Sequence, residues 1–253
     1  MKKILLEISY LGSDYCGYQV QPGKKTVQSE LNNAAKALFG FDCDIVGCSR
    51  TDSGVHANQF FATVTKKGEG YIDTSIPIQK IPSALCFHLP NDIAVKSAQW
   101  VELDFHPRYN VKSKEYLYRI YCGSMRNPFE EGRAWHYPKQ LAPEALANMQ
   151  KAADEFIGTY DFSAFMAANS SVADTVRTIY SLSVEAHGEN VDIRVCGDGF
   201  LYNMVRIIVG TLMAVAEGKI AYSDIKQIIE SKDRARAGVT AVPQGLYLNK
   251  VTY

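Results

Sequence analysis

The stretch that decides the interpretation of this chain is Ser49-Arg50-Thr51-Asp52-Ser53-Gly54-Val55-His56-Ala57. Residues 41–45 before it and residues 60–64 after it alternate apolar and polar side chains, which predicts two strands. Gly54 and its polar neighbours are typical of a turn. The pattern therefore places Asp52 in a connection between two strands of one sheet.

Asp52 has the surroundings that a nucleophilic carboxylate needs. Arg50 lies two residues away, and a nearby guanidinium favours the charged form of a carboxylate. Loops are also where substrates reach a side chain. Taken alone, residues 51–54 equally fit an ordinary turn in which Asp and Ser hydrogen-bond to the backbone. We expect His56 to help shape this turn, not to act as a base.

Further elements follow from periodicity and from helix start and stop signals. Thr26 is a plausible N-cap for a helix that begins at Val27, and Gly40 is its stop. Strands are predicted over 4–10, 92–101, 114–122, 178–184, 191–196 and 246–251, and helices over 72–86, 141–156, 200–217 and 223–232.

Two helix ends, Leu38–Asp42 and Phe156–Phe162, show a weak sequence similarity that is typical of an internal repeat. Each carries a Phe, a Gly and an Asp in that order. We expect an α+β fold of two related halves around a central catalytic cleft. Each half is a mainly antiparallel sheet with helices on one face. Residues 1–106 form the half with the Asp52 loop, and residues 107–253 form the half with Tyr116 and Arg206.

Composition places the chain among ordinary globular proteins. Of its 253 residues, 47% are apolar and 21% are charged. No apolar run is long enough for a membrane helix, and Glu7 comes too early for a signal peptide, so we expect a cytoplasmic protein without membrane contact. The six cysteines are scattered without a Cys-x-x-Cys pair, so neither a zinc site nor a disulfide framework is expected.

The formal net charge is zero, but it is unevenly distributed. Residues 108–139 hold seven Lys or Arg and three Glu, a net charge of +4, whereas residues 141–200 hold three basic and nine acidic residues, a net charge of −6. Such a chain can offer one face to an acidic partner, although an ordinary solvated surface explains the same counts.

Several blocks in order along the chain resemble one family. Besides residues 49–57, they are Gly17–Gln21, Thr26–Leu31, Leu89–Ile93, Phe105–Tyr109, Lys114–Tyr118, Asp161–Phe165, Phe200–Arg206 and Ala237–Leu246. In these blocks the chain resembles the bacterial tRNA pseudouridine synthases that act on the anticodon arm. The order of the blocks over the whole chain is more specific than any one of them.

The resemblance implies isomerisation of uridine to pseudouridine at tRNA positions 38, 39 and 40, by a homodimer that uses neither a metal nor an organic cofactor. It assigns Asp52 as the nucleophile and pairs it with Arg206. It also places Tyr116 against the target uracil. Arg50 is then expected to hold a phosphate or to occupy the space that the flipped base leaves.

Each of these residues also has a plain structural interpretation. Arg206 lies in the most apolar helix, where a buried guanidinium needs a carboxylate or a phosphate, so a structural salt bridge would also explain it. Tyr116 shares a strand face with Tyr118 and would ordinarily be a core residue. Arg50 fits a solvated turn. As phosphate contacts we name Lys112, Lys114 and Arg126.

Three other functions remain open on the sequence. A related synthase with a different RNA target, or a catalytically silent tRNA-binding or folding factor, would share the blocks above. A phosphate-transfer enzyme could also use an aspartyl nucleophile, but it needs a second acid for magnesium. No carboxylate occurs between Ser53 and Lys67.

Overall fold

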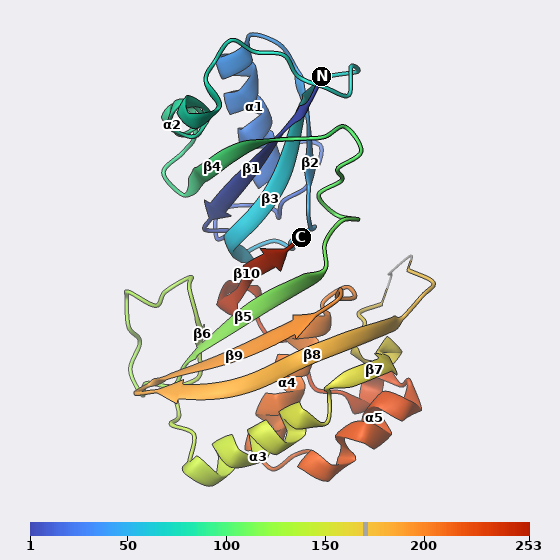
Figure 1. The fold of residues 1–253 in the computed structure, drawn as a ribbon. Coiled ribbons are helices and arrows are strands. Elements are labelled where there is room, and N and C mark those ends of the chain that lie inside the picture. Colours follow the sequence, from blue (N-terminus) through green and yellow to red (C-terminus); the bar gives the residue numbers. More distant parts are fainter. Residues whose placement is uncertain (169–171) are drawn as a thin grey trace. The chain divides into compact units, whose positions relative to one another are not determined.

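The computed structural model describes residues 1–168 and 172–253. The chain divides into two compact units, one made of Met1–Lys112 with Tyr247–Tyr253, the other of Ser113–Leu246. Each unit combines a sheet with helices, which confirms the expected α+β class (Figure 1). The domain boundary at residues 106 and 107 stays a prediction. Along the chain, the first of the two compact units runs to Lys112 and the second begins at Ser113, and the last residues of the chain belong to the first unit.

The sheet of the first unit runs in the order β4-β1-β3-β10. Its elements are β1 (Lys3–Tyr10), α1 (Val27–Phe39), β2 (Cys43–Gly47), β3 (His56–Lys66), α2 (Ile81–His88), β4 (Ile93–Val101) and β10 (Leu246–Thr252). Strands β1 and β2 each pair antiparallel with β3, and β4 pairs antiparallel with β1. Strand β10 runs parallel to β3 and pairs with its first residues, His56 and Ala57.

The core of this unit follows directly from the alternation in β1. Ile4, Leu6 and Ile8 are at most 1% exposed and point to the same face of the sheet. Helices α1 and α2 contact each other, and each contacts the sheet, so they cover one face of it. The helix signals are confirmed, since the side chain of Thr26 caps α1 and Gly40 ends it in the left-handed conformation.

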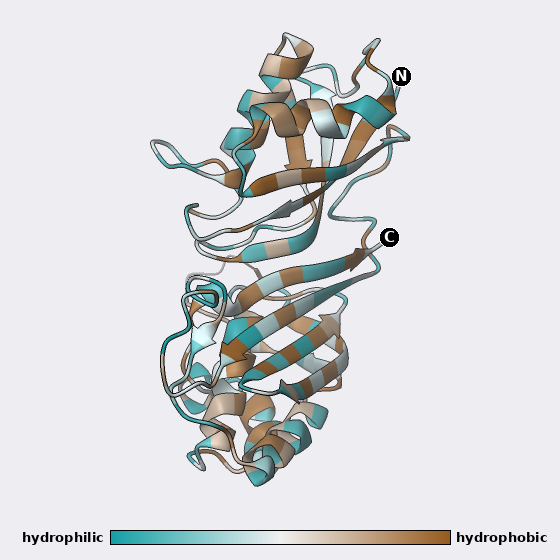
Figure 2. Cartoon of the chain, turned by 90° about the vertical axis from the view of Figure 1, so that its left-hand side faces the viewer, coloured by the Kyte–Doolittle hydropathy of each residue, from teal (hydrophilic) through white to brown (hydrophobic). Residues whose placement is uncertain are grey.

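The sheet of the second unit runs in the order β5-β9-β8-β7, all antiparallel, with β6 parallel to β5. Its elements are β5 (Ser113–Tyr121), β6 (Trp135–His136), α3 (Pro143–Asp154), β7 (Gly158–Asp161), β8 (Val176–His187), β9 (Asn190–Gly197), α4 (Met204–Ala216) and α5 (Ile225–Ser231). Figure 1 shows the three helices gathered on one side of these strands. Bands of alternating hydropathy run along the strands in Figure 2, as one buried and one exposed face require.

Helix α4 is the centre of the second unit. Ten of its 13 residues are buried, as the nearly continuous apolar run predicted. Its glycine, Gly210, lets the segment at Gly238 and Val239 lie against the helix backbone. A Cβ added at Gly210 would lie 1.8 Å from the carbonyl oxygen of Val239. The buried hydroxyl of Thr211 accepts a hydrogen bond from the Gly238 N–H at 2.9 Å, which ties the segment to the helix.

Four details of the sequence-based elements were wrong. The helix predicted over 200–217 begins only at Met204, after Asn203 in the left-handed conformation. The helix predicted to start at residue 72 starts at Ile81 after a 3₁₀ turn, because Ile72 instead bridges Lys2 in the sheet. Strands β6 and β7 were not predicted. They hold two and four residues, too few for alternation to be recognised.

Replacing Gly210 with alanine should lower the free energy of unfolding by about 1–3 kcal/mol, because the new methyl group meets a backbone carbonyl that cannot rotate away. Urea unfolding followed by circular dichroism measures this. Gly199→Ala is the matched control, since its nearest neighbours would lie at 3.6 Å, an ordinary contact. Equal stability of the two variants would contradict the close approach.

Candidate active site

Asp52 lies in the connection between β2 and β3, as predicted. Within this turn the Val55 N–H donates to the carbonyl oxygen of Asp52 at 3.2 Å, and Gly54 has a φ of +80°. The positive φ explains why a glycine stands there. The Asp52 side chain is half-buried and that of Arg50 is exposed.

The loop that follows β1, between Tyr10 and Thr26, holds this turn by its backbone. The Tyr18 N–H donates to the carbonyl oxygen of Thr51 at 3.1 Å. The Gly54 N–H and the Ser53 hydroxyl both donate to the carbonyl oxygen of Tyr15, at 3.4 and 3.1 Å. Bonds on both sides of Asp52 therefore fix the position of its Cα.

Two glycines make this close packing possible. A Cβ added at Gly17, whose φ is +85°, would lie 2.7 Å from the carbonyl oxygen of Thr51. A Cβ added at Gly12 would lie 2.0 Å from the carbonyl oxygen of Val55. No other residue type fits at either position without moving the turn.

Side-chain hydrogen bonds also hold the Asp52 turn and the loop after β1 in place. The hydroxyl groups of Tyr10 and Thr51 lie 2.8 Å apart in a hydrogen bond. The fully buried His56 accepts a hydrogen bond from the Gly12 N–H at Nδ1, at 2.8 Å, so this nitrogen carries no proton. The expectation that His56 shapes the turn is confirmed. The buried Tyr15 hydroxyl donates to Asp92 at 2.5 Å and anchors the loop from its other side.

In the second unit, Tyr116 lies on β5 opposite Val195 of β9. Its side chain is 8% exposed, and its ring meets the Phe200 ring edge to face at 5.2 Å. Tyr118, two residues on, is fully buried and donates its hydroxyl to the carbonyl oxygen of Val242 at 2.7 Å. Burial raises the pKa of Tyr118 far above its ordinary value, so this hydroxyl stays protonated and structural.

Arg206 lies in the first turn of α4, and neutral oxygens hold two of its donors. Its Nε donates to the carbonyl oxygen of Ala241 at 2.7 Å, and its Nη1 donates to Oδ1 of Asn203 at 2.9 Å. Asn203 precedes the helix with a φ of 59°, an uncommon conformation that asparagine tolerates. The guanidinium group is therefore fixed in orientation and only half-buried.

The backbone carbonyl groups of two consecutive residues, Ala241 and Val242, connect helix α4 with strand β5. Val242 accepts from Tyr118 on β5, and Ala241 accepts from Arg206 on α4. The structure thus brings Arg206 beside the strand that carries Tyr116, and it places Arg50 with Asp52 on one turn. Sequence reasoning missed Asn203 and Ala241 as partners of Arg206. Both lie inside blocks that carry the family resemblance, which was the available signal.

Two properties of the described residues bear on other classes of function. In residues 1–168 and 172–253 no cluster of three or more His, Cys, Asp or Glu side chains is arranged to hold a metal ion. The same residues include no helix with the length and apolar character needed to cross a membrane.

Comparison with known proteins agrees with the family resemblance that the sequence blocks indicated. A family model described as tRNA pseudouridine synthase matches residues 8–110 and 152–253. The chain is 44% identical to tRNA pseudouridine synthase A of Thermoanaerobacter sp. (strain X514), with 100% of both chains covered. It is 46% identical to the enzyme of the same name from Acetivibrio thermocellus, again over 100% of both. A third relative of that name, from Caldicellulosiruptor saccharolyticus, is 43% identical over the full length of both.

Pseudouridine synthases are isomerases, because the base leaves and rejoins the same nucleotide. With a family model matched over most of its length and with full-length relatives at this identity, the chain belongs to the tRNA pseudouridine synthase family.

Proposed function

We propose that this protein isomerises uridine to pseudouridine in the anticodon stem-loop of tRNA, at positions 38, 39 and 40, with Asp52 as the nucleophile. The main support for this role of Asp52 is the fixed position of its turn, residues 51–56. Hydrogen bonds hold the turn on both sides of Asp52. A nucleophile gains most from such fixed placement, because orientation alone supplies several kcal/mol of a reaction barrier.

In the proposed reaction the Asp52 carboxylate attacks C1′ of the ribose or C6 of the base. The bond between N1 and C1′ breaks, the uracil turns over, and a bond forms between C5 and C1′. The bond between Asp52 and the carbon that it attacked also breaks, which releases the free carboxylate. The proton on C5 is lost and N1 gains one, so no atom enters or leaves overall. Either route needs an anionic oxygen in contact with the nucleotide.

The other candidate residues have supporting roles in this proposal. Tyr116 stacks on the uracil and assists removal of the C5 proton. Arg206 pairs with the Asp52 carboxylate during the reaction. The hydrogen bonds to Ala241 and Asn203 support that role, because they fix the orientation of the guanidinium group. Arg50 is exposed on the Asp52 turn and fills the space of the flipped base or holds a phosphate.

Flipping the target base out of its stack costs a few kcal/mol, which phosphate contacts must offset. We propose Lys112, Lys114 and Arg126 as such contacts. Arg126 lines a cavity of about 140 Å³ on the second unit, together with Trp135 and His136. A homodimer, which the family resemblance implies, would let a chain of zero net charge present basic side chains from two copies to one tRNA.

Replacing Asp52 with asparagine keeps the shape and removes the charge. Pseudouridine formation should fall by a factor on the order of 10³ or more, because an amide is a poor nucleophile, while tRNA binding is retained. Release of tritium from tRNA labelled at uridine C5 measures the reaction, and filter binding measures affinity. Asp44→Asn, which changes an exposed acid on β2, is the control and should be fully active. Unchanged pseudouridine formation in the Asp52 variant would refute the assignment.

Gly17→Ala should lower kcat about 10- to 100-fold, because its methyl group would push the Asp52 turn out of place. Gly23→Ala is a matched control in the same loop. Gly23 also has a positive φ, +69°, but nothing lies within 4 Å of its added Cβ. If kcat falls by the same factor in Gly17→Ala and in Gly23→Ala, the loss comes from backbone strain and not from displacement of the Asp52 turn.

Affinity for tRNA should fall about a thousandfold between 50 and 200 mM salt if some six phosphates are contacted. Each of the variants Lys112→Ala, Lys114→Ala and Arg126→Ala should lower the slope of log affinity against log salt by about one. Filter binding over a salt series measures this. Affinity that does not depend on salt would contradict the proposed contacts.

A further inference from the structure

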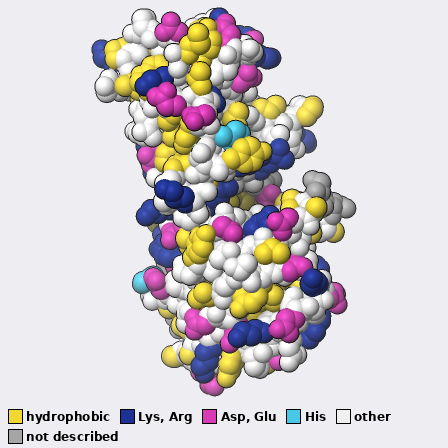
Figure 3. All heavy atoms as spheres, turned by 45° about the vertical axis from the view of Figure 1, so that its right-hand side comes forward, with side chains coloured by type: hydrophobic (Ala, Val, Ile, Leu, Met, Phe, Trp, Pro, Cys, Tyr) yellow, Lys and Arg dark blue, Asp and Glu magenta, His cyan; other side chains and the backbone are white. Residues whose placement is uncertain are grey.

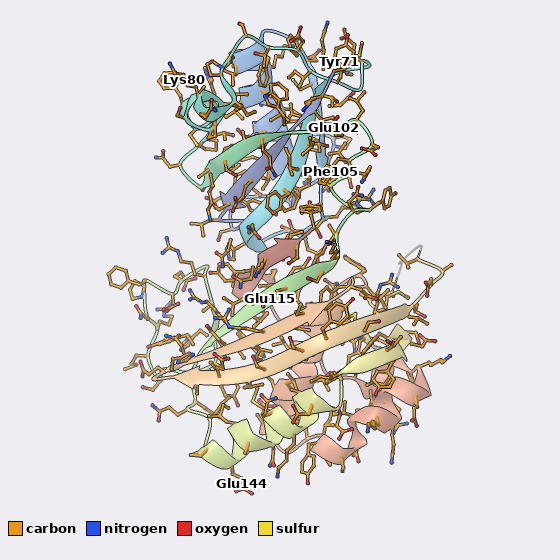
Figure 4. All side chains as sticks on the ribbon, viewed as in Figure 1. Tyr71, Lys80, Glu102, Phe105, Glu115 and Glu144 are labelled. Carbon is orange, nitrogen blue, oxygen red and sulfur yellow. The ribbon has the colours of Figure 1, made fainter. Side chains whose placement is uncertain are left out.

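Two aromatic rings stack on the surface of the first unit, on the segment between β4 and β5. The rings of His106 and Tyr109 lie nearly parallel, with an interplanar angle of 27° and centroids 4.2 Å apart. Yet Tyr109 is 78% exposed. One face of its ring is therefore covered by His106, while most of the side chain lies in water. Figure 4 labels Phe105 and Glu102 on this segment.

Local hydrogen bonds hold the pair in this arrangement. The Asn110 N–H donates to the carbonyl oxygen of His106 at 3.1 Å, and the His106 N–H donates to Oδ1 of Asn110 at 2.7 Å. Nδ1 of His106 accepts from the N–H groups of Arg108 and Tyr109, at 3.1 and 3.4 Å. The turn is thus closed on both sides and the imidazole ring is oriented by its own backbone.

The turn is also anchored to the rest of the first unit. The Tyr253 hydroxyl donates to the carbonyl oxygen of Pro107 at 2.8 Å, and the Tyr253 ring packs on Phe105 and Phe61 at 5.1 and 5.3 Å. Lys3 donates to the carbonyl oxygen of Phe105 at 3.1 Å. A ligand that stacks on Tyr109 would therefore find the ring already ordered, which reduces the entropy cost of binding.

The charges around the pair favour an anionic partner. Burial, followed by the nearby Arg108 and Lys3, lowers the pKa of His106, so the imidazole is neutral at pH 7. Both charged side chains that act on this ring are thus cations. The same segment also holds two acids, Asp104 and Glu102, of which Glu102 is paired with Lys2 at 3.2 Å. Figure 3 shows Lys and Arg side chains, in dark blue, on one face of the molecule.

We propose that the His106–Tyr109 pair is a stacking platform for an unpaired base of the RNA substrate, separate from the uridine that reacts. The inference rests on the proposed function. A flat ring with one open face suits every nucleobase, and the cations beside it suit the phosphates on either side of that base. A protein partner would require a larger apolar surface than one exposed tyrosine ring offers.

Tyr109→Ala should weaken binding of an unmodified tRNA transcript about 5- to 150-fold, because stacking contributes about 1–3 kcal/mol per base. KM for tRNA should rise by the same factor. Tyr109→Trp, which keeps a flat ring, should bind as tightly as the wild type. Since stacking releases no counterions, the salt dependence of affinity should keep its slope in the alanine variant.

Phe87→Ala is the matched control in the same unit. Phe87 is 85% exposed and also has a histidine neighbour, but the ring of His88 meets it edge-on at 84°. This variant should bind tRNA as the wild type does.

Three results would overturn the platform: wild-type affinity in Tyr109→Ala, affinity as weak in the tryptophan variant as in the alanine one, or a changed oligomeric state of Tyr109→Ala in sedimentation. The last would make the ring an interface between copies. Failure of the proposed function is distinguishable, because the wild type would then form no pseudouridine in the same transcript.

Discussion

The site depends on one close approach of two backbone segments, the loop after β1 and the turn before β3. The hydrogen bond from the Tyr18 N–H to the carbonyl oxygen of Thr51 forms only because Gly17 has no Cβ to obstruct it. With the bonds to Tyr15 on the other side, this contact places the carboxylate of Asp52 on a fixed backbone. A short turn with a single acid thereby acquires the rigidity that nucleophilic chemistry requires.

A comparable arrangement fixes the cation in the second unit. Consecutive carbonyl groups at Ala241 and Val242 hold the guanidinium of Arg206 and the hydroxyl of Tyr118. The helix α4 and the strand β5 are thus linked through one extended segment, and Gly238 in that segment packs directly against Gly210 of the helix. In both units, glycines admit a backbone segment close enough to orient a charged side chain.

Local signals account for what the sequence predicted well. Alternation identified the strands on either side of Asp52, and Thr26 and Gly40 fixed the ends of α1 because caps are set by neighbouring residues. Strands β6 and β7 were missed because they hold only two and four residues. The hydrogen bonds of Arg206 to Ala241 and Asn203 were not predicted either, because a backbone carbonyl such as that of Ala241 leaves no residue type to recognise in the sequence.

The proposed reaction needs one residue that reacts, Asp52, and one RNA on which it acts. The most direct test is to map pseudouridine in all cellular RNA from cells without this protein, and from the same cells supplied with either the wild type or an Asp52→Asn variant. We predict that pseudouridine disappears from the anticodon arm of tRNA and returns with the wild type only. Its persistence in the absence of the protein, or its return with the variant, would contradict the account.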